Sequence, residues 1–186
     1  MKIYFCFFII FFSQSIIYSQ DYELSLQELC SLSSDIVIAK PISSTTFQSE
    51  NKKHIYTNIK FGVIDKIKGR FTKHDEFEML VYGGKLNGIT QFVVDAPSYK
   101  IGEESLLFLK ENKSRESIRI FFTVTGGIQG KYNIYIDENT GVKHLTKDQA
   151  YIPTPNEESD RNIQNILFDQ PRLEQMIKLI KTEILR

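Results

Sequence analysis

Residues 55–67 read IYTNIKFGVIDKI, and this stretch decides the fold class. Its apolar residues recur at every second position, as in a β-strand with one buried face and one wet face. The buried-type face carries Thr57, Ile59, Phe61 and Val63, and the other face carries Asn58, Lys60 and Gly62. A glycine in the middle of a strand indicates a bulge or a sharp bend. We therefore expect residues 55–67 to form a long strand that bends at Gly62.

Shorter segments with the same alternation lie on both sides of this strand. They are separated by turn signals, such as Asn87-Gly88 and the paired glycines at 83–84 and 126–127. The segment 105–109 is apolar on both faces and should be central, whereas Pro41 suits a strand end or a bulge. The expected strands span 35–39, 76–81, 89–94, 105–109, 118–124, 131–136 and 142–145.

The order of these segments predicts a closed sheet. Strands do not alternate with helices, so a parallel α/β sheet is not expected. Glycine-marked bends between short strands favour closure, because closure removes exposed strand edges. The sequence therefore predicts a mainly β fold, a small antiparallel β-barrel within residues 20–145.

Two helices should flank this barrel. Residues 25–33 begin with Ser25 and Glu28 at the spacing of a capping box. Residues 169–186 form the second helix, with Asp169 as its cap and Pro171 in its first turn. One face of this second helix carries the apolar residues Leu173, Met176, Ile177, Ile180 and Ile184. We expect that face to pack on the barrel, and a second protein chain or a membrane surface is the alternative.

The start of the chain has the features of an export signal. Residues 1–19 contain Lys2, an apolar run too short to span a bilayer, and a small residue, Ser19, before the expected cleavage point. The alternative is an uncleaved N-terminal anchor. We expect a secreted or periplasmic protein without stable membrane insertion after cleavage. Residues 146–168 are polar, and we expect a linker or a draped surface loop there.

The net charge of the chain and its lack of catalytic motifs argue against several classes of function. The chain has 23 basic and 23 acidic side chains, and this balance argues against a nucleic-acid partner. His54, His74 and His144 do not have the spacing of metal ligands, and no nucleophile motif is present. We therefore expect no cofactor and no enzymatic activity.

Cys30 is the one cysteine expected in the mature chain, since Cys6 lies in the signal. Leu26, Leu29 and Cys30 share one face of the first helix, so the thiol should point toward a core. Intermolecular pairing and thiol chemistry are the alternatives. No histidine lies close in the sequence to lower the pKa of the thiol.

A larger pattern resembles a known family. Leu29-Cys30 at a helix end, the strand at 35–39 and a strand that closes on Lys68-Gly69 resemble the netrin-like modules, which include the tissue inhibitors of metalloproteinases. The glycine-containing runs at 83–84, 102–109 and 126–130 resemble secreted bacterial domains of the same type. The resemblance spans residues 24–136 and implies an OB-like five-stranded barrel with flanking helices.

The resemblance does not carry over the inhibitory chemistry of that family. In the inhibitors an N-terminal cysteine binds the zinc of the protease, whereas the mature chain here would begin Gln20-Asp21-Tyr22. Cys30 matches a bridged cysteine of the family, but its partner is absent. Zinc-chelating inhibition is therefore not expected.

The function expected from these features is that of a secreted, non-catalytic OB-like binding module. Its partner would be another extracellular or envelope protein, such as a protease. The alternative is a small carbohydrate- or ligand-binding barrel that uses exposed aromatics among Tyr82, Phe92, Tyr99 and Tyr132. Candidate contacts lie in polar, irregular segments at 47–54, 83–88 and 110–116. The candidate residues are Gln48, Lys52, His54, Lys85, Asn87, Lys113 and Arg115.

Overall fold

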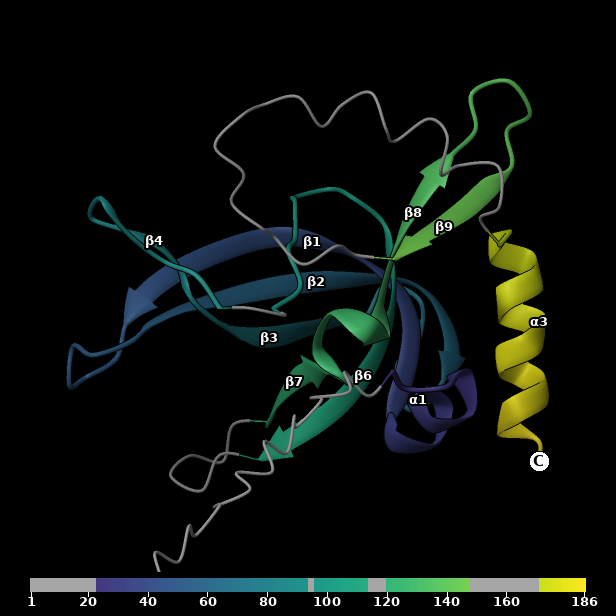
Figure 1. Ribbon diagram of the computed structural model, residues 1–186, viewed down its shortest axis with the longest axis horizontal. Helices are drawn as coiled ribbons and strands as arrows, with labels where there is room; N and C mark the ends of the chain where they lie inside the picture. Colours follow the sequence, from purple (N-terminus) through teal and green to yellow (C-terminus); the bar gives the residue numbers. More distant parts are fainter. Residues whose placement is uncertain (1–22, 94–95, 114–119, 148–170) are drawn as a thin grey trace, which may run out of the picture.

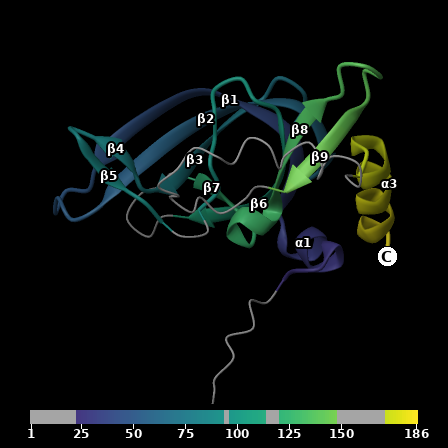
Figure 2. The ribbon, with the colours of Figure 1, turned by 45° about the horizontal axis from the view of Figure 1, so that its top comes forward.

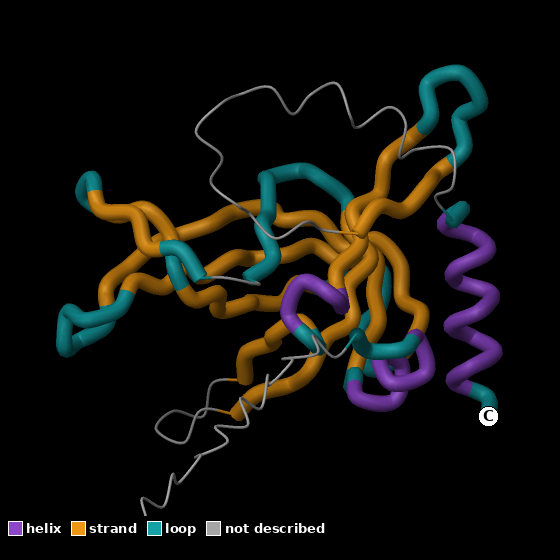
Figure 3. The backbone as a smooth tube through the Cα atoms, viewed as in Figure 1, coloured by secondary structure: helices purple, strands orange, loops and turns teal. Residues whose placement is uncertain are grey.

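The computed structural model describes residues 23–93, 96–113, 120–147 and 171–186. The expected signal at 1–19 lies outside the described residues, and so does most of the expected linker at 146–168. In the described part, strands form one large sheet and one small hairpin, with helices at one side (Figures 1 and 3). No helix of that part has the length and apolar character needed to cross a bilayer.

The order of elements along the chain matches the predicted mainly β fold. The elements are α1 (Leu26–Leu32), β1 (Asp35–Gln48), β2 (Ile55–Lys68), β3 (Glu76–Tyr82), β4 (Gly84–Leu86), β5 (Ile89–Gln91), β6 (Ser105–Lys113), β7 (Ile120–Val124), the 3-10 turn η1 (Gly127–Gly130), β8 (Lys131–Ile136), β9 (Lys143–Lys147) and α3 (Leu173–Ile184).

Five strands close into a ring, which confirms the small OB-like barrel. The ring runs β1-β2-β3-β7-β6 and returns to β1, because β6 also pairs with residues 35–39. All contacts in the ring are antiparallel except the one between β3 and β7. That closing contact is parallel and has a single residue pair, Met79 with Phe122. The β8–β9 hairpin extends the sheet from β6.

Apolar side chains gather on both sides of the barrel wall. The inner cluster fills the barrel and consists of Val37, Ala39, Ile59, Phe61, Val63, Phe71, Phe77, Met79, Leu107, Leu109 and Phe122. The outer cluster consists of Leu29, Cys30, Ile36, Ile38, Leu106, Phe108, Tyr132, Leu145, Leu173 and Ile180. Residues 36–39 of β1 and 106–109 of β6 contribute to both clusters, so these two segments are buried on both faces, as the sequence of residues 105–109 predicted.

The helices cover the outer cluster. Ser25 and Glu28 form the expected capping box of α1, and Cys30 is buried at 3% exposure. The C-terminal helix α3 packs against α1, β2 and β9, so its apolar face lies on the barrel side as predicted. It begins later than expected, with Arg172 at its N-cap position, and Asp169 lies outside the described residues.

A buried carboxylate joins the start of β1 to the turn that follows β2. The buried Asp35 carboxylate accepts hydrogen bonds from the backbone N–H of Arg70 and from the Ser34 hydroxyl, each at 2.8 Å. Gly69 has φ of +96°, and a Cβ there would collide with the Asp35 carboxylate. The start of β1 is therefore fixed to the turn that follows β2.

Strand β1 is much longer than the predicted 35–39. It continues to Gln48 through a bulge between Pro41 and Ser43, so the bulge expected at Pro41 is present. Residues 43–48 pair with residues 55–60 of β2 but have no strand partner on their other side among the described residues. This β1–β2 arm projects beyond the barrel (Figures 1 and 2).

Candidate functional site

Two hairpins lie together at the end of the β1–β2 arm, which we call the hairpin end. One is the β1–β2 hairpin with its turn at 49–54, and the other is the β4–β5 hairpin with its turn at Asn87-Gly88 (Figure 2). The second is anchored on the first, since the Ile55 N–H donates to the Gln91 side-chain oxygen at 2.9 Å. The Gly83 N–H also donates to the Ile55 carbonyl at 2.8 Å.

A row of aromatic side chains crosses the three strands of this end. Phe47 of β1 is in register with Tyr56 of β2, which is in register with Tyr82 of β3. The Phe47 and Tyr56 rings stack with centroids 5.9 Å apart, and the Tyr56 and Tyr82 rings meet edge-on at 5.0 Å. Phe47 remains 42% exposed and Tyr82 36% exposed. We call these three residues the aromatic row.

His54 extends the aromatic row into the β1–β2 turn. Its ring lies 5.2 Å from the Tyr82 ring, and its Nδ1 shares a hydrogen bond with the Tyr82 hydroxyl. Each neighbouring pair of rings can contribute a fraction of a kcal/mol beyond burial, so the contacts hold the rings in one arrangement. A binding surface with fixed side chains loses less entropy when a partner docks.

The turns beside the row are also held by hydrogen bonds. The Gln48 amide donates to the Lys52 carbonyl at 2.8 Å, and the Lys53 N–H donates to the Asn51 side-chain oxygen at 3.0 Å. Lys52 and Asn87 have positive φ, so each sits in a tight turn with its side chain exposed. The hairpin end carries a small positive charge, because its turns contain one acidic residue, Glu50, and three lysines, Lys52, Lys53 and Lys85.

Five of the seven predicted contact residues are brought together by the fold. Gln48, Lys52, His54, Lys85 and Asn87 all belong to the hairpin end. The expected loop at 110–116 is wrong in its first part, because β6 continues through residues 110–113 where β7 supplies its partner. Lys113 therefore ends a strand of the barrel wall, and Arg115 lies outside the described residues.

The aromatic residues considered from the sequence divide into two groups. Tyr132 is buried in the outer cluster, and Tyr99 is half-buried against the inner cluster. Tyr82 and Phe92 are exposed, Phe92 at 66%. Sequence reasoning missed Phe47 and Tyr56, and the signal that could have found them is the register of the β1–β2 hairpin.

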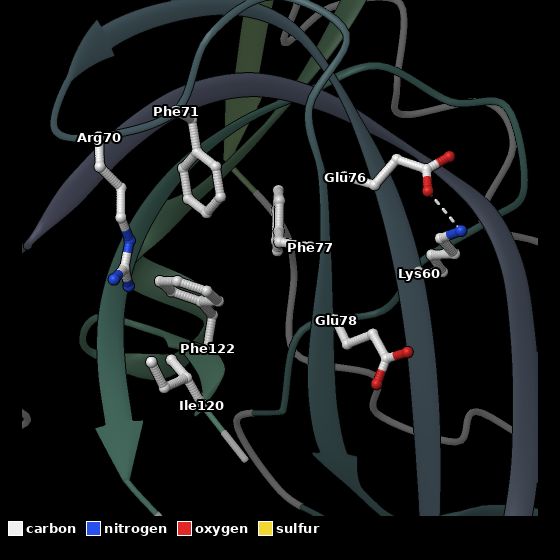
Figure 4. A pocket seen from close by; sticks show the side chains of 8 residues that line it. All are labelled: Lys60, Arg70, Phe71, Glu76, Phe77, Glu78, Ile120 and Phe122. Atoms are coloured by element: carbon white, nitrogen blue, oxygen red, sulfur yellow. Dashed lines mark ion pairs between the residues drawn. The ribbon is translucent and has the colours of Figure 1, made fainter. Parts of the chain in front are cut away.

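A second candidate site is a cavity at the place where β3 and β7 close the barrel. It is a cavity of about 490 Å³ lined by Lys60, Arg70, Phe71, Glu76, Phe77, Glu78, Ile120 and Phe122 (Figure 4). This volume is within the range of small-ligand sites. The Arg70 guanidinium lies 4.9 Å from the centre of the Phe122 ring and pairs with Glu111 at 2.8 Å.

The described residues give little support to thiol or metal chemistry. Burial raises the pKa of the Cys30 thiol, which keeps it in the less nucleophilic protonated form. No group of three or more histidine, cysteine, aspartate or glutamate side chains in the described part of the chain is placed to hold a metal ion. Comparison of the chain with models of protein families, with curated proteins and with solved structures gives no match.

Proposed function

We propose that the chain is a secreted, non-catalytic binding module that recognises another extracellular or envelope protein through the hairpin end. The observation that carries this proposal is the exposed aromatic row, Phe47–Tyr56–Tyr82, held in register by three strands. Exposed aromatic side chains on a rigid frame are typical of the centres of protein interfaces.

The surroundings of the aromatic row also favour a protein partner. Ile89 and Phe92 of the neighbouring hairpin region are 62% and 66% exposed, so this hairpin also presents apolar area to solvent. Lysines and asparagines of the two turns supply a polar rim. An apolar centre with a polar rim is the usual anatomy of a protein interface.

A carbohydrate ligand fits the geometry less well. A sugar ring packs on an open aromatic face, whereas the Phe47 and Tyr56 rings stack on each other at an interplanar angle of 24°. The Tyr56 and Tyr82 rings make a T-shaped contact with an interplanar angle of 82°. Much of the aromatic surface is therefore used within the row. The resemblance to netrin-like modules agrees with a protein partner, and a protease stays one candidate.

The test uses the chain from residue 20 onward, immobilised and exposed to the secreted and envelope proteins of the source organism. The double variant Phe47→Ala, Tyr82→Ala removes two members of the aromatic row. The control Ile101→Ala, Ile136→Ala removes apolar groups that are 59% and 56% exposed elsewhere. We expect a protein that binds the wild type and the control, and binds the double variant at least about tenfold more weakly.

The proposal is wrong if the purified protein captured by the wild type binds the double variant with unchanged affinity. It is also wrong if the same chain binds a glycan array through Tyr82 and captures no protein. Circular dichroism of both variants checks that each keeps its β-sheet content.

A further inference from the structure

Strand β3 has one edge that is almost unpaired among the residues that the structure describes. It pairs with β2 along residues 76–82, but on its other side it meets β7 only at Met79. The pairing does not continue to the first residues of the two strands, Glu76 and Ile120, and both of these residues line the cavity of Figure 4. We call this part of the barrel wall the gap between β3 and β7. An open strand edge offers backbone N–H and C=O groups to an incoming strand.

One side of this edge is apolar. Phe71, Phe77 and Phe122 contact one another, with ring centroids 5.1 Å, 5.1 Å and 5.5 Å apart. All three are nearly buried, whereas Ile120 at the rim is 46% exposed. This side of the gap therefore offers an apolar floor that can be reached from solvent through the rim.

The other side of the edge is acidic. Glu76 and Glu78 point away from the phenylalanines, as alternation along β3 requires (Figure 4). Lys60 pairs with Glu76, and Arg70 pairs with Glu111. Glu78 accepts a hydrogen bond from the Asn58 amide at 3.2 Å and has no cationic partner in the described part of the chain. Lys60 also lies opposite Glu78 in the β2–β3 register. Glu76, Glu78 and Glu111 together outnumber Lys60 and Arg70 by one, so the charged groups around the gap have one negative charge in excess.

We propose that the gap between β3 and β7 binds an extended segment of a partner protein that lies beside β3. Side chains of such a strand alternate between the two sides of the edge. One large apolar side chain would lie on the phenylalanines, and the next would be a lysine or arginine beside Glu78. The segment recognised by this site is therefore an extended sequence in which apolar and basic residues alternate. This inference does not depend on the hairpin end.

The probe is a short capped peptide in which lysine and leucine alternate. Its control is a peptide of the same composition in which the leucines and the lysines are grouped. We expect the alternating peptide to bind the wild-type chain at least about tenfold more tightly than the grouped peptide. Hydrogen exchange should show new protection of the backbone amides of residues 76–78 when the alternating peptide is bound.

Two pairs of variants locate the binding site. Ile120→Glu at the rim should weaken binding at least about tenfold, whereas Ile136→Glu, at a similarly exposed isoleucine, should not change it. Glu78→Lys should reject the lysine peptide and accept a peptide in which glutamate replaces lysine. Glu138→Lys, at an exposed glutamate of the β8–β9 turn, should leave the preference as in the wild type.

The proposal is wrong if neither peptide binds the folded wild-type chain at millimolar concentration. It is also wrong if Ile120→Glu and Ile136→Glu weaken binding equally, or if Glu78→Lys leaves the charge preference unchanged. All these variants carry exposed substitutions, and an unchanged thermal midpoint is required before each affinity is compared.

Discussion

The side-chain ammonium of Lys68 donates a hydrogen bond to the backbone carbonyl of Cys30 at 2.7 Å. A second hydrogen bond, at 2.8 Å, goes to the carbonyl of Ser33. These carbonyls lie at the C-terminal end of α1, where the helix leaves acceptors without partners and a positive charge is favourable. The last residue of β2 therefore holds α1 in place, and with it the outer cluster that contains Cys30.

Replacing Lys68 by methionine should destabilise the protein. The change keeps most of the side-chain stem but removes both hydrogen bonds, so we expect a loss of about 2 kcal/mol in the free energy of unfolding. Urea denaturation measures the loss. Lys66→Met is the control, because Lys66 lies on the same strand with an exposed side chain. Equal losses in the two variants would contradict the role given to Lys68.

Replacing Gly69 by alanine should cost more than the backbone conformation alone explains. Gly69 and Gly102 both have positive φ, +96° and +86°, but a Cβ at Gly102 meets no atom within 4 Å. Gly102→Ala should therefore lose about 1 kcal/mol of stability. Gly69→Ala should lose clearly more, because its Cβ displaces Asp35. Comparison of thermal midpoints tests this difference, and similar values would show that the contact with Asp35 is easily relieved.

The aromatic row should contribute little to stability. Phe77→Ala opens a hole in the inner cluster and should lose roughly 3–5 kcal/mol. Phe47→Ala removes a ring that is 42% exposed and should lose less than about 1 kcal/mol, the range of a cross-strand pair. Chemical denaturation of both variants provides the measurement. A large loss in Phe47→Ala would indicate that the row serves the fold rather than a partner.

Stability should fall at alkaline pH partly because of Cys30. Burial raises the pKa of its thiol, so the native state holds this proton more tightly than the unfolded chain does. The contribution is fully present below the pKa of the unfolded thiol, about 8.5, and decreases as pH rises above it. The slope of unfolding free energy between pH 8 and 9.5 should be smaller in Cys30→Ala. An identical slope would mean that the thiol is already solvated.

Local alternation was sufficient to predict most strands, because a half-buried strand repeats its pattern every two residues. It was insufficient for β1 beyond Lys40, where Pro41 suited a strand end or a bulge and residues 42–48 have no clear apolar alternation. Those residues form a strand because β2 supplies a continuous partner and a bulge takes up Pro41. The parallel contact between Met79 and Phe122 joins distant segments, and no local pattern reports it.

The difference between local patterns and contacts of distant segments also explains which residues of the hairpin end could be predicted from the sequence. Gln48, Lys52 and Asn87 could be chosen because polar, turn-forming residues are usually exposed. Phe47 and Tyr56 each look like ordinary strand residues, and they become a surface only through the register of three strands. The gap between β3 and β7 could not be predicted, because it exists only since these two strands share a single residue pair, Met79 with Phe122.

The outer part of the β1–β2 arm lies outside both apolar clusters of the barrel. Residues 43–54 contribute no side chain to the inner or outer cluster of the described structure. If the proposed function is right, mutations there change which partner the hairpin end binds while the barrel folds as before. Relatives of this chain could thus diversify at that tip under selection for new targets, and a protein engineer could graft foreign sequences onto it.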